Sequence, residues 1–118
     1  MNIEDVIRAH NDWKAKLQKG IANQETFQVD TIAGDKNCVF GKWLYSEGKT
    51  NFGTLPSFAK CLEKHAAFHK EAGRIAGLIN NKRFDDAESA LNTGSAYASC
   101  SADVKVAINI LAREAKLK

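Results

Sequence analysis

Apolar residues recur every three or four positions along most of the chain, which is the spacing of one face of a helix. The pattern covers three long segments, residues 2–24, 56–81 and 84–117. Alternation of apolar and polar residues, which marks a strand, is confined to a patch around Phe27 and Val29 that is too short to form one. The periodicity therefore predicts an all-α fold.

Residues that begin and end helices fall at the edges of these segments. Asn2 is a typical N-cap for the first segment, and Pro56, the only proline, suits the first turn of the second. A shorter helix is predicted over residues 36–47, with Asp35 as its cap and Gly48 as its C-terminal stop.

The last segment has features of both a core helix and an interaction surface. Gly94 and Ser95 can kink it or divide it in two, and Val106 and Ile110 make it apolar on a second side, which favours a partner. The chain then forms three long helices and one short one, or four long ones if this segment breaks. We predict an antiparallel four-helix bundle with a short extra helix that carries a cysteine, in a single domain over residues 1–118.

The composition is that of an ordinary globular protein and excludes several classes of function. The chain has 118 residues, 17 of them basic and 14 acidic, and the net charge of +3 is not gathered into a basic run. We therefore expect no nucleic-acid binding. The apolar runs are far shorter than a membrane span, and the N-terminal region lacks the apolar stretch of a signal peptide. These features predict a cytoplasmic protein with no membrane partner.

The three cysteines are widely spaced and odd in number, which does not fit a disulfide framework. In a reducing compartment such residues are buried thiols, metal ligands or reactive thiols. They are Cys38, Cys61 and Cys100.

All three histidines of the chain fall within apolar helical stripes. His10 lies between Ile7 and Trp13 in the first segment. His65 and His69 are four residues apart in the second, so their imidazoles lie one turn apart on one face and can bind one metal ion. Buried imidazoles need hydrogen-bond partners, so a shared metal explains inward-facing histidines better than separate packing roles. Three imidazoles favour zinc, which then needs a fourth ligand to close a tetrahedral site.

The fourth ligand is Cys38, Cys61 or an acidic residue. Cys61 is one turn before His65 on the same face, but a row from Cys61 to His69 spans about 12 Å of helix. One ion with bonds of about 2.0–2.3 Å would not easily contact both ends of that row. Cys38 comes from a different element, so spacing favours it without excluding the others.

Other metal chemistries fit less well. Zinc proteases carry a glutamate directly after the first histidine as a general base, and here that position is Ala66. A di-iron bundle needs paired Glu-x-x-His motifs, and Glu63 is only two residues before His65. A plain helical interaction domain without metal remains as a further alternative.

Three sequence motifs in a fixed order resemble those of the chemoreceptor zinc-binding domain, a bacterial cytoplasmic module. They are HNDWKAKL with His10 and Trp13, CVFGKWLY over Cys38–Tyr45, and HAAFH with its two histidines. The resemblance implies a zinc ion held by three histidines and one cysteine. Carried over position by position, the ligands are His10, Cys38, His65 and His69.

The resemblance also implies a function that is not enzymatic. Domains of this family are helical bundles that commonly form homodimers, at the end of soluble chemoreceptors or beside diguanylate cyclase domains. There they tune chemotaxis or cyclic-di-GMP signalling in response to zinc or to oxidants such as hypochlorous acid. This chain contains neither a coiled-coil signalling region nor a cyclase domain, so it is a stand-alone member or a part of a longer receptor. The alternative is a structural-zinc helical interaction module with no sensing role.

Overall fold

The computed structural model describes residues 2–117, and every regular element in that range is a helix. This confirms the all-α prediction. The seven helices are α1 (Ile3–Asn23), α2 (Val29–Ala33), α3 (Val39–Leu44), α4 (Glu47–Phe52), α5 (Pro56–Asn80), α6 (Phe84–Ala90) and α7 (Ala96–Ala115).

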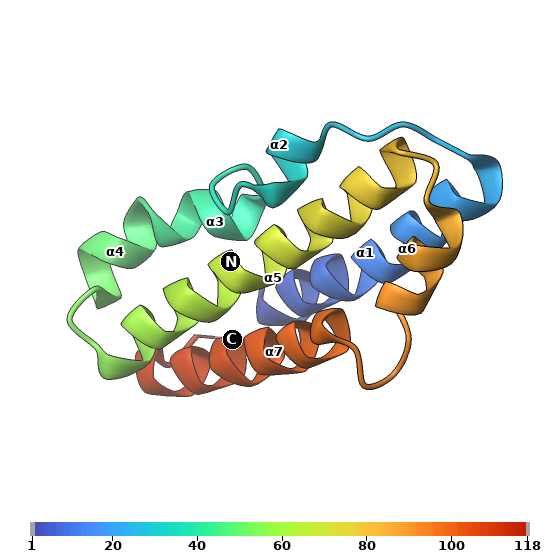
Figure 1. Ribbon diagram of the computed structural model, residues 1–118. Coiled ribbons are helices and arrows are strands. Elements are labelled where there is room, and N and C mark those ends of the chain that lie inside the picture. The colour runs from blue at the N-terminus through green and yellow to red at the C-terminus, as the bar shows by residue number, and fades with distance from the viewer. Residues whose placement is uncertain (1, 118) are drawn as a thin grey trace.

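Three long helices, α1, α5 and α7, lie alongside one another (Figure 1). The short helices α2, α3 and α4 carry the chain back from the end of α1 to the start of α5, and α6 leads into α7. The chain thus runs back and forth along the long helices, and its second pass, from α1 to α5, consists of short helices. This interrupted pass supplies the cysteine of the site described below.

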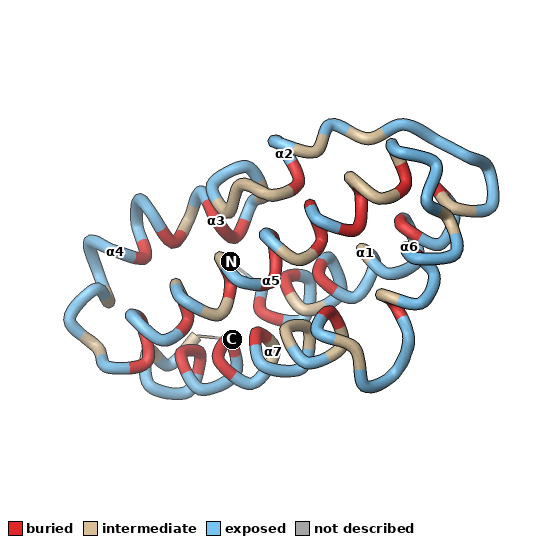
Figure 2. Tube along the Cα trace, in the orientation of Figure 1, coloured by how far each residue is buried: buried red, intermediate tan, exposed pale blue. Residues whose placement is uncertain are grey.

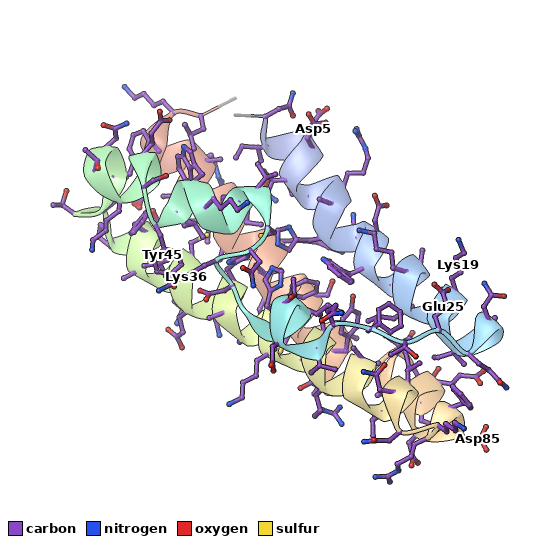
Figure 3. All side chains as sticks on the ribbon, turned by 90° about the horizontal axis from the view of Figure 1, so that it is seen from above. Asp5, Lys19, Glu25, Lys36, Tyr45 and Asp85 are labelled. Carbon is purple, nitrogen blue, oxygen red and sulfur yellow. The ribbon has the colours of Figure 1, made fainter. Side chains whose placement is uncertain are left out.

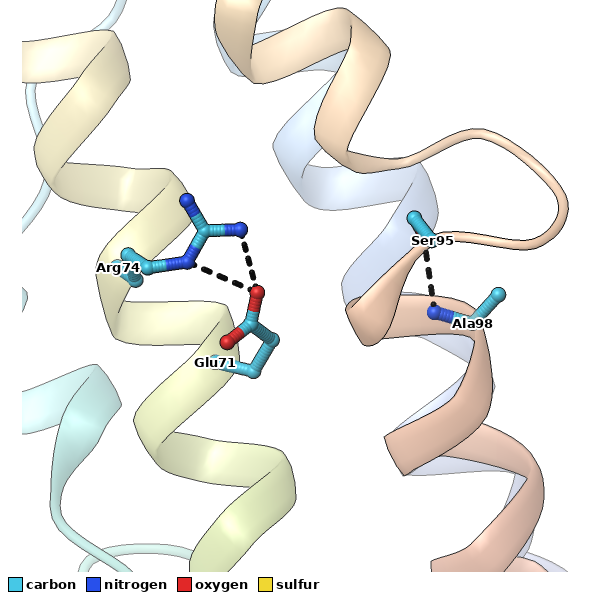
Figure 4. A network of polar contacts seen from close by, with 4 residues as sticks. All are labelled: Glu71, Arg74, Ser95 and Ala98. Atoms are coloured by element: carbon cyan, nitrogen blue, oxygen red, sulfur yellow. Dashed lines mark hydrogen bonds and ion pairs between the residues drawn. The ribbon is translucent and has the colours of Figure 1, made fainter.

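Several helix boundaries lie where local chemistry predicts them. The Asn2 side chain accepts a hydrogen bond from the Asp5 amide at 3.1 Å, and Pro56 occupies the first turn of α5. The last segment does divide, because Gly94 adopts a left-handed φ of 86°, but its first part is the short α6 and not a fourth long helix. Ser95 then caps α7 by accepting the Ala98 amide at 3.2 Å, as drawn in Figure 4.

The predicted helix over residues 36–47 is wrong in both its boundaries. Its N-cap is Cys38, whose Sγ accepts the Gly41 amide at 3.2 Å. Asp35 does not cap it and instead accepts a hydrogen bond from the Tyr45 hydroxyl at 2.6 Å. Gly48 does not stop it either, because it lies inside α4, where an added Cβ would meet the Trp43 ring at 2.8 Å.

The helix α2 lies between two predicted helices, in a segment for which the sequence predicted no regular element. It has five residues, too few for a periodic pattern, and it packs on α5. Ile32 enters the core, and Ala33 lies so close to α5 that a Cβ on Gly73 would stand 2.9 Å from the Ala33 Cα. Packing against α5 therefore orders α2, since isolated helices of this length are unstable.

The core follows α5, which is covered by α7 on one side and by α2 on the other. Figure 2 shows the buried positions turned toward the interior on all three long helices. Charged side chains such as those of Lys19, Glu25 and Asp85 project outward around the rim in Figure 3. The buried polar residues among residues 2–117 are Ser57 and three histidines, His10, His65 and His69, which are at most 2% exposed. No helix in the described part of the chain is both long and apolar enough to cross a membrane.

Candidate metal centre

The structure brings together the four predicted ligands from three separate elements. His10 comes from α1, Cys38 stands directly before α3, and His65 and His69 lie one turn apart on α5. One potential ligand atom from each lies within 4.8 Å of the other three. Segments far apart in the sequence thus converge on one point of the core.

The spacing of these atoms fits a tetrahedral zinc ion. His65 Nε2 and His69 Nε2 are 3.1 Å apart, and Cys38 Sγ lies 3.3 Å and 3.5 Å from these nitrogens. With Zn–N bonds of about 2.0–2.1 Å and a Zn–S bond of about 2.3 Å, tetrahedral geometry places two nitrogens about 3.3 Å apart and a nitrogen and a sulfur about 3.6 Å apart. The observed separations are slightly shorter than these values, so a small outward movement of the side chains would accommodate one ion.

Backbone carbonyls orient two of the three imidazoles. The Nδ1–H of His10 donates to the Val6 carbonyl at 2.8 Å, and the Nδ1–H of His69 donates to the Ile32 carbonyl at 3.0 Å. A carbonyl can only accept, so both rings carry their proton on Nδ1 and present an Nε2 lone pair to the cluster. His10 Nε2 is buried and has no hydrogen-bond partner within residues 2–117. A buried acceptor of this kind is costly unless something binds it.

Aromatic rings enclose the cluster and restrict the rotation of the imidazoles. Phe40 lies edge-on to His10 and His65, with ring centroids 6.0 Å and 5.2 Å away. Phe68 lies edge-on to His10 and His69, with ring centroids 5.2 Å and 5.5 Å away. Both phenylalanines lie within the sequence motifs, two residues from Cys38 and one residue from His69, and the contact of Phe68 with the imidazoles was not predicted from the sequence.

Burial sets the protonation of the site. Desolvation lowers the pKa of His10 and His69, and it lowers the pKa of His65 to about 2 with help from the neighbouring imidazoles. All three rings are therefore neutral near pH 7, the form that binds metals. Burial also raises the pKa of the Cys38 thiol, although the Gly41 amide opposes that change. A cation is thus needed to hold Cys38 as a thiolate.

The other cysteines lie outside the cluster. Cys61 is fully buried in the core, where desolvation raises its pKa to about 12, and it is absent from the group of converging ligand atoms. Cys100 is half-buried on α7. The preference for Cys38, reached from spacing alone, thus agrees with the position of its sulfur.

Four neutral or thiolate donors, three of them buried among aromatic rings, define a helical metal-binding domain. The chain belongs to the family of the chemoreceptor zinc-binding domain, whose sequence pattern matches residues 10–76, more than half of the chain. Neither a curated protein nor a solved structure matches it. The family is a sensory one and not catalytic, and the His10–Cys38–His65–His69 cluster supports zinc as its cofactor.

Proposed function

We propose that this chain is a bacterial, cytoplasmic zinc-binding sensory domain whose zinc ligands are His10, Cys38, His65 and His69. It tunes chemotaxis or cyclic-di-GMP signalling in response to zinc or to oxidants such as hypochlorous acid. The observation that carries the proposal is the convergence of the four ligand atoms at distances suited to tetrahedral zinc. When bound, zinc would supply the positive charge that keeps the Cys38 sulfur ionised.

Cys38 couples the centre to the start of α3. Its sulfur lies among the histidine nitrogens and also accepts the Gly41 amide that begins the helix. Hypochlorous acid oxidises a thiolate by two electrons, so that the sulfur gains a hydroxyl as sulfenic acid and chloride leaves. A sulfenic acid is neutral and larger, so it would weaken both contacts and release α3. Phe40 and Trp43, whose rings stack 5.9 Å apart on α3, would then repack.

The Cys38→Ser variant tests this role. We expect hypochlorous acid to release zinc from the wild type and to change its tryptophan fluorescence, because Trp43 lies on α3. The Cys38→Ser protein should bind zinc at least roughly tenfold more weakly and show no oxidant-dependent change in fluorescence. The Cys100→Ser variant removes a half-buried thiol outside the cluster and should respond like the wild type. An unchanged oxidant response in Cys38→Ser would contradict the proposal.

The architecture and environment of the domain are part of the proposal. The back-and-forth course of the chain supports an antiparallel four-helix bundle in one domain, with α2, α3 and α4 in place of a continuous second helix. The cysteines are all free thiols, which supports a reducing compartment. The signalling partner would be a chemoreceptor or diguanylate cyclase region, and neither nucleic acid nor membrane is expected to bind.

We further propose that the domain forms a homodimer through α7. Val106 is 58% exposed and Ile110 is 41% exposed, and their spacing of four residues places them on one face. Two large apolar side chains exposed together on one helix face support an interface there.

The double variant Val106→Glu, Ile110→Glu should therefore be monomeric in analytical ultracentrifugation where the wild type is dimeric. The matched control, Ala15→Glu with Gln18→Glu, adds the same charge at exposed positions of α1 and should remain dimeric. A dimer that survives in the α7 variant would place the interface elsewhere.

A structural zinc without a sensing role is the alternative function. It uses the same ligands, so it predicts the same metal content. It differs in that oxidation of Cys38 would unfold the domain as a whole and would not produce a folded second state. Circular dichroism of the oxidised protein separates these outcomes, because a sensor keeps its helices.

A further inference from the structure

A groove lies beside the metal centre, between one side of α1 and the start of α3. Its volume is about 470 Å³, within the range of about 300–1,000 Å³ that is usual for small-molecule sites. Its α1 wall runs from Asn2 to Lys16, which is about 21 Å of helix at about 1.5 Å per residue. The groove thus follows about four turns of helix, a length that suits a chain-like molecule better than a compact one.

The middle of the groove is apolar. Its walls there are Val6, Ala9, Trp13, Val39 and Phe40. Val39 is 80% exposed, the highest value among the large apolar side chains of residues 2–117, and Trp13 is only partly buried. An apolar ligand would cover these side chains and gain about 25 cal/mol for each Å² removed from water.

The charges at the groove favour an anion. Outside the metal centre, only Asp5 and Lys16 among its lining residues carry a full charge. Asp5, near the start of α1 in Figure 3, is already paired with Arg8 at 3.0 Å. Lys16 has no carboxylate partner within the described chain, and its Nζ lies 4.6 Å from the centre of the Trp13 ring. One uncompensated cation therefore stands next to the apolar surface.

The groove also touches the centre itself. His10 and Cys38 are both among its lining residues. A molecule in the groove would rest against two of the four converging side chains, so its binding and that of the metal would be linked.

We propose that this groove binds an amphipathic monocarboxylate with an unbranched alkyl chain. The carboxylate lies near Lys16, and the chain runs along Trp13 and Ala9 toward Val6. The length and apolar walls of the groove match the alkyl chain of such a molecule, and the unpaired Lys16 matches its carboxylate. The site differs in chemistry from the zinc cluster and does not depend on a sensing role for zinc.

Calorimetric titration of zinc-loaded protein with decanoate, kept below its micellar concentration, tests the proposal. We expect one decanoate per chain in the wild type. Ala9→Trp should weaken binding at least roughly tenfold, because the added ring fills the middle of the groove. Ala15→Trp introduces the same ring at an exposed position of the same helix and should leave binding unchanged. Equal binding in the two variants would overturn the proposal.

The charge is tested separately. Lys16→Gln should weaken decanoate binding by about two- to fivefold, as expected for an exposed ion pair. Lys19→Gln, the matched control outside the groove, should have no effect. Decanol should bind the wild type as weakly as decanoate binds Lys16→Gln. If decanol and decanoate bind equally well, the assignment of a carboxylate is wrong.

Two further measurements keep the outcome decisive if Ala9→Trp does not fold. In ¹⁵N-labelled wild type, decanoate should shift the Trp13 indole signal, and the absence of any shift would overturn the proposal. Ultracentrifugation of the Val106→Glu, Ile110→Glu variant shows whether a second copy of the chain occupies the groove: a dimer that persists in this variant and dissociates on addition of decanoate would also overturn the proposal. Zinc content, measured in parallel at saturating zinc, is expected to be unchanged, so failure here is distinguishable from failure of the zinc site.

Discussion

The His69→Ala variant is expected to contain no zinc and to melt roughly 10–20 °C below the zinc-loaded wild type. His69 is central to the cluster, since its Nε2 lies 3.1 Å from His65 Nε2 and 3.5 Å from Cys38 Sγ. A metal at about 100–1,000 times its dissociation constant stabilises the folded chain by about 3–4 kcal/mol. The substitution also removes the hydrogen bond to the Ile32 carbonyl, which contributes about 1 kcal/mol.

Thermal unfolding with and without a chelator separates the loss of metal from the loss of the ring. The chelator should lower the melting temperature of the wild type by most of the same amount and should not affect His69→Ala. Elemental mass spectrometry gives the metal content of both. One zinc per chain in the variant, or a rise in its melting temperature on addition of zinc, would contradict the prediction.

The long helices and the inward direction of the histidines could be predicted because both depend on periodicity. An apolar stripe identifies the buried face of a helix of twenty residues. His10, His65 and His69 fall in such stripes, and all three are buried. The ligand set followed from this placement together with the family motifs, and the structure brings its four members together.

The second pass of the chain could not be predicted, because its helices are too short to show a period. Helix α2 is ordered by the packing of Ile32 and Ala33 against α5, and helix α4 by the close approach of Gly48 to the Trp43 ring. Both depend on packing between helices, which local sequence propensity does not reveal. The start of α3 was misplaced for a chemical reason. Cysteine is not a usual N-cap, yet the Cys38 sulfur accepts an amide here as a capping oxygen would.

Gly41 makes that cap possible, and the Gly41→Ala variant is expected to be destabilised by about 2–3 kcal/mol. An added Cβ would overlap the Asp35 carbonyl oxygen and would stand 2.8 Å from the Asp35 carbonyl carbon and 3.2 Å from the Lys36 Cα. These are backbone atoms and cannot swing aside, so α3 would have to move away from the preceding turn. Because Cys38 immediately precedes α3, we also expect zinc affinity to fall at least roughly tenfold.

The same substitution at Gly77 is the matched control and should have the opposite sign. Gly77 lies inside α5, and a Cβ there meets no atom within 4 Å. Alanine favours a helix interior over glycine by about 0.5–1 kcal/mol, so Gly77→Ala should raise the free energy of unfolding and leave zinc affinity unchanged. Urea unfolding and a competitive zinc titration measure both quantities in each variant. If Gly41→Ala were as stable as Gly77→Ala and bound zinc equally well, the close packing of α3 on the Asp35 turn would not be what positions Cys38.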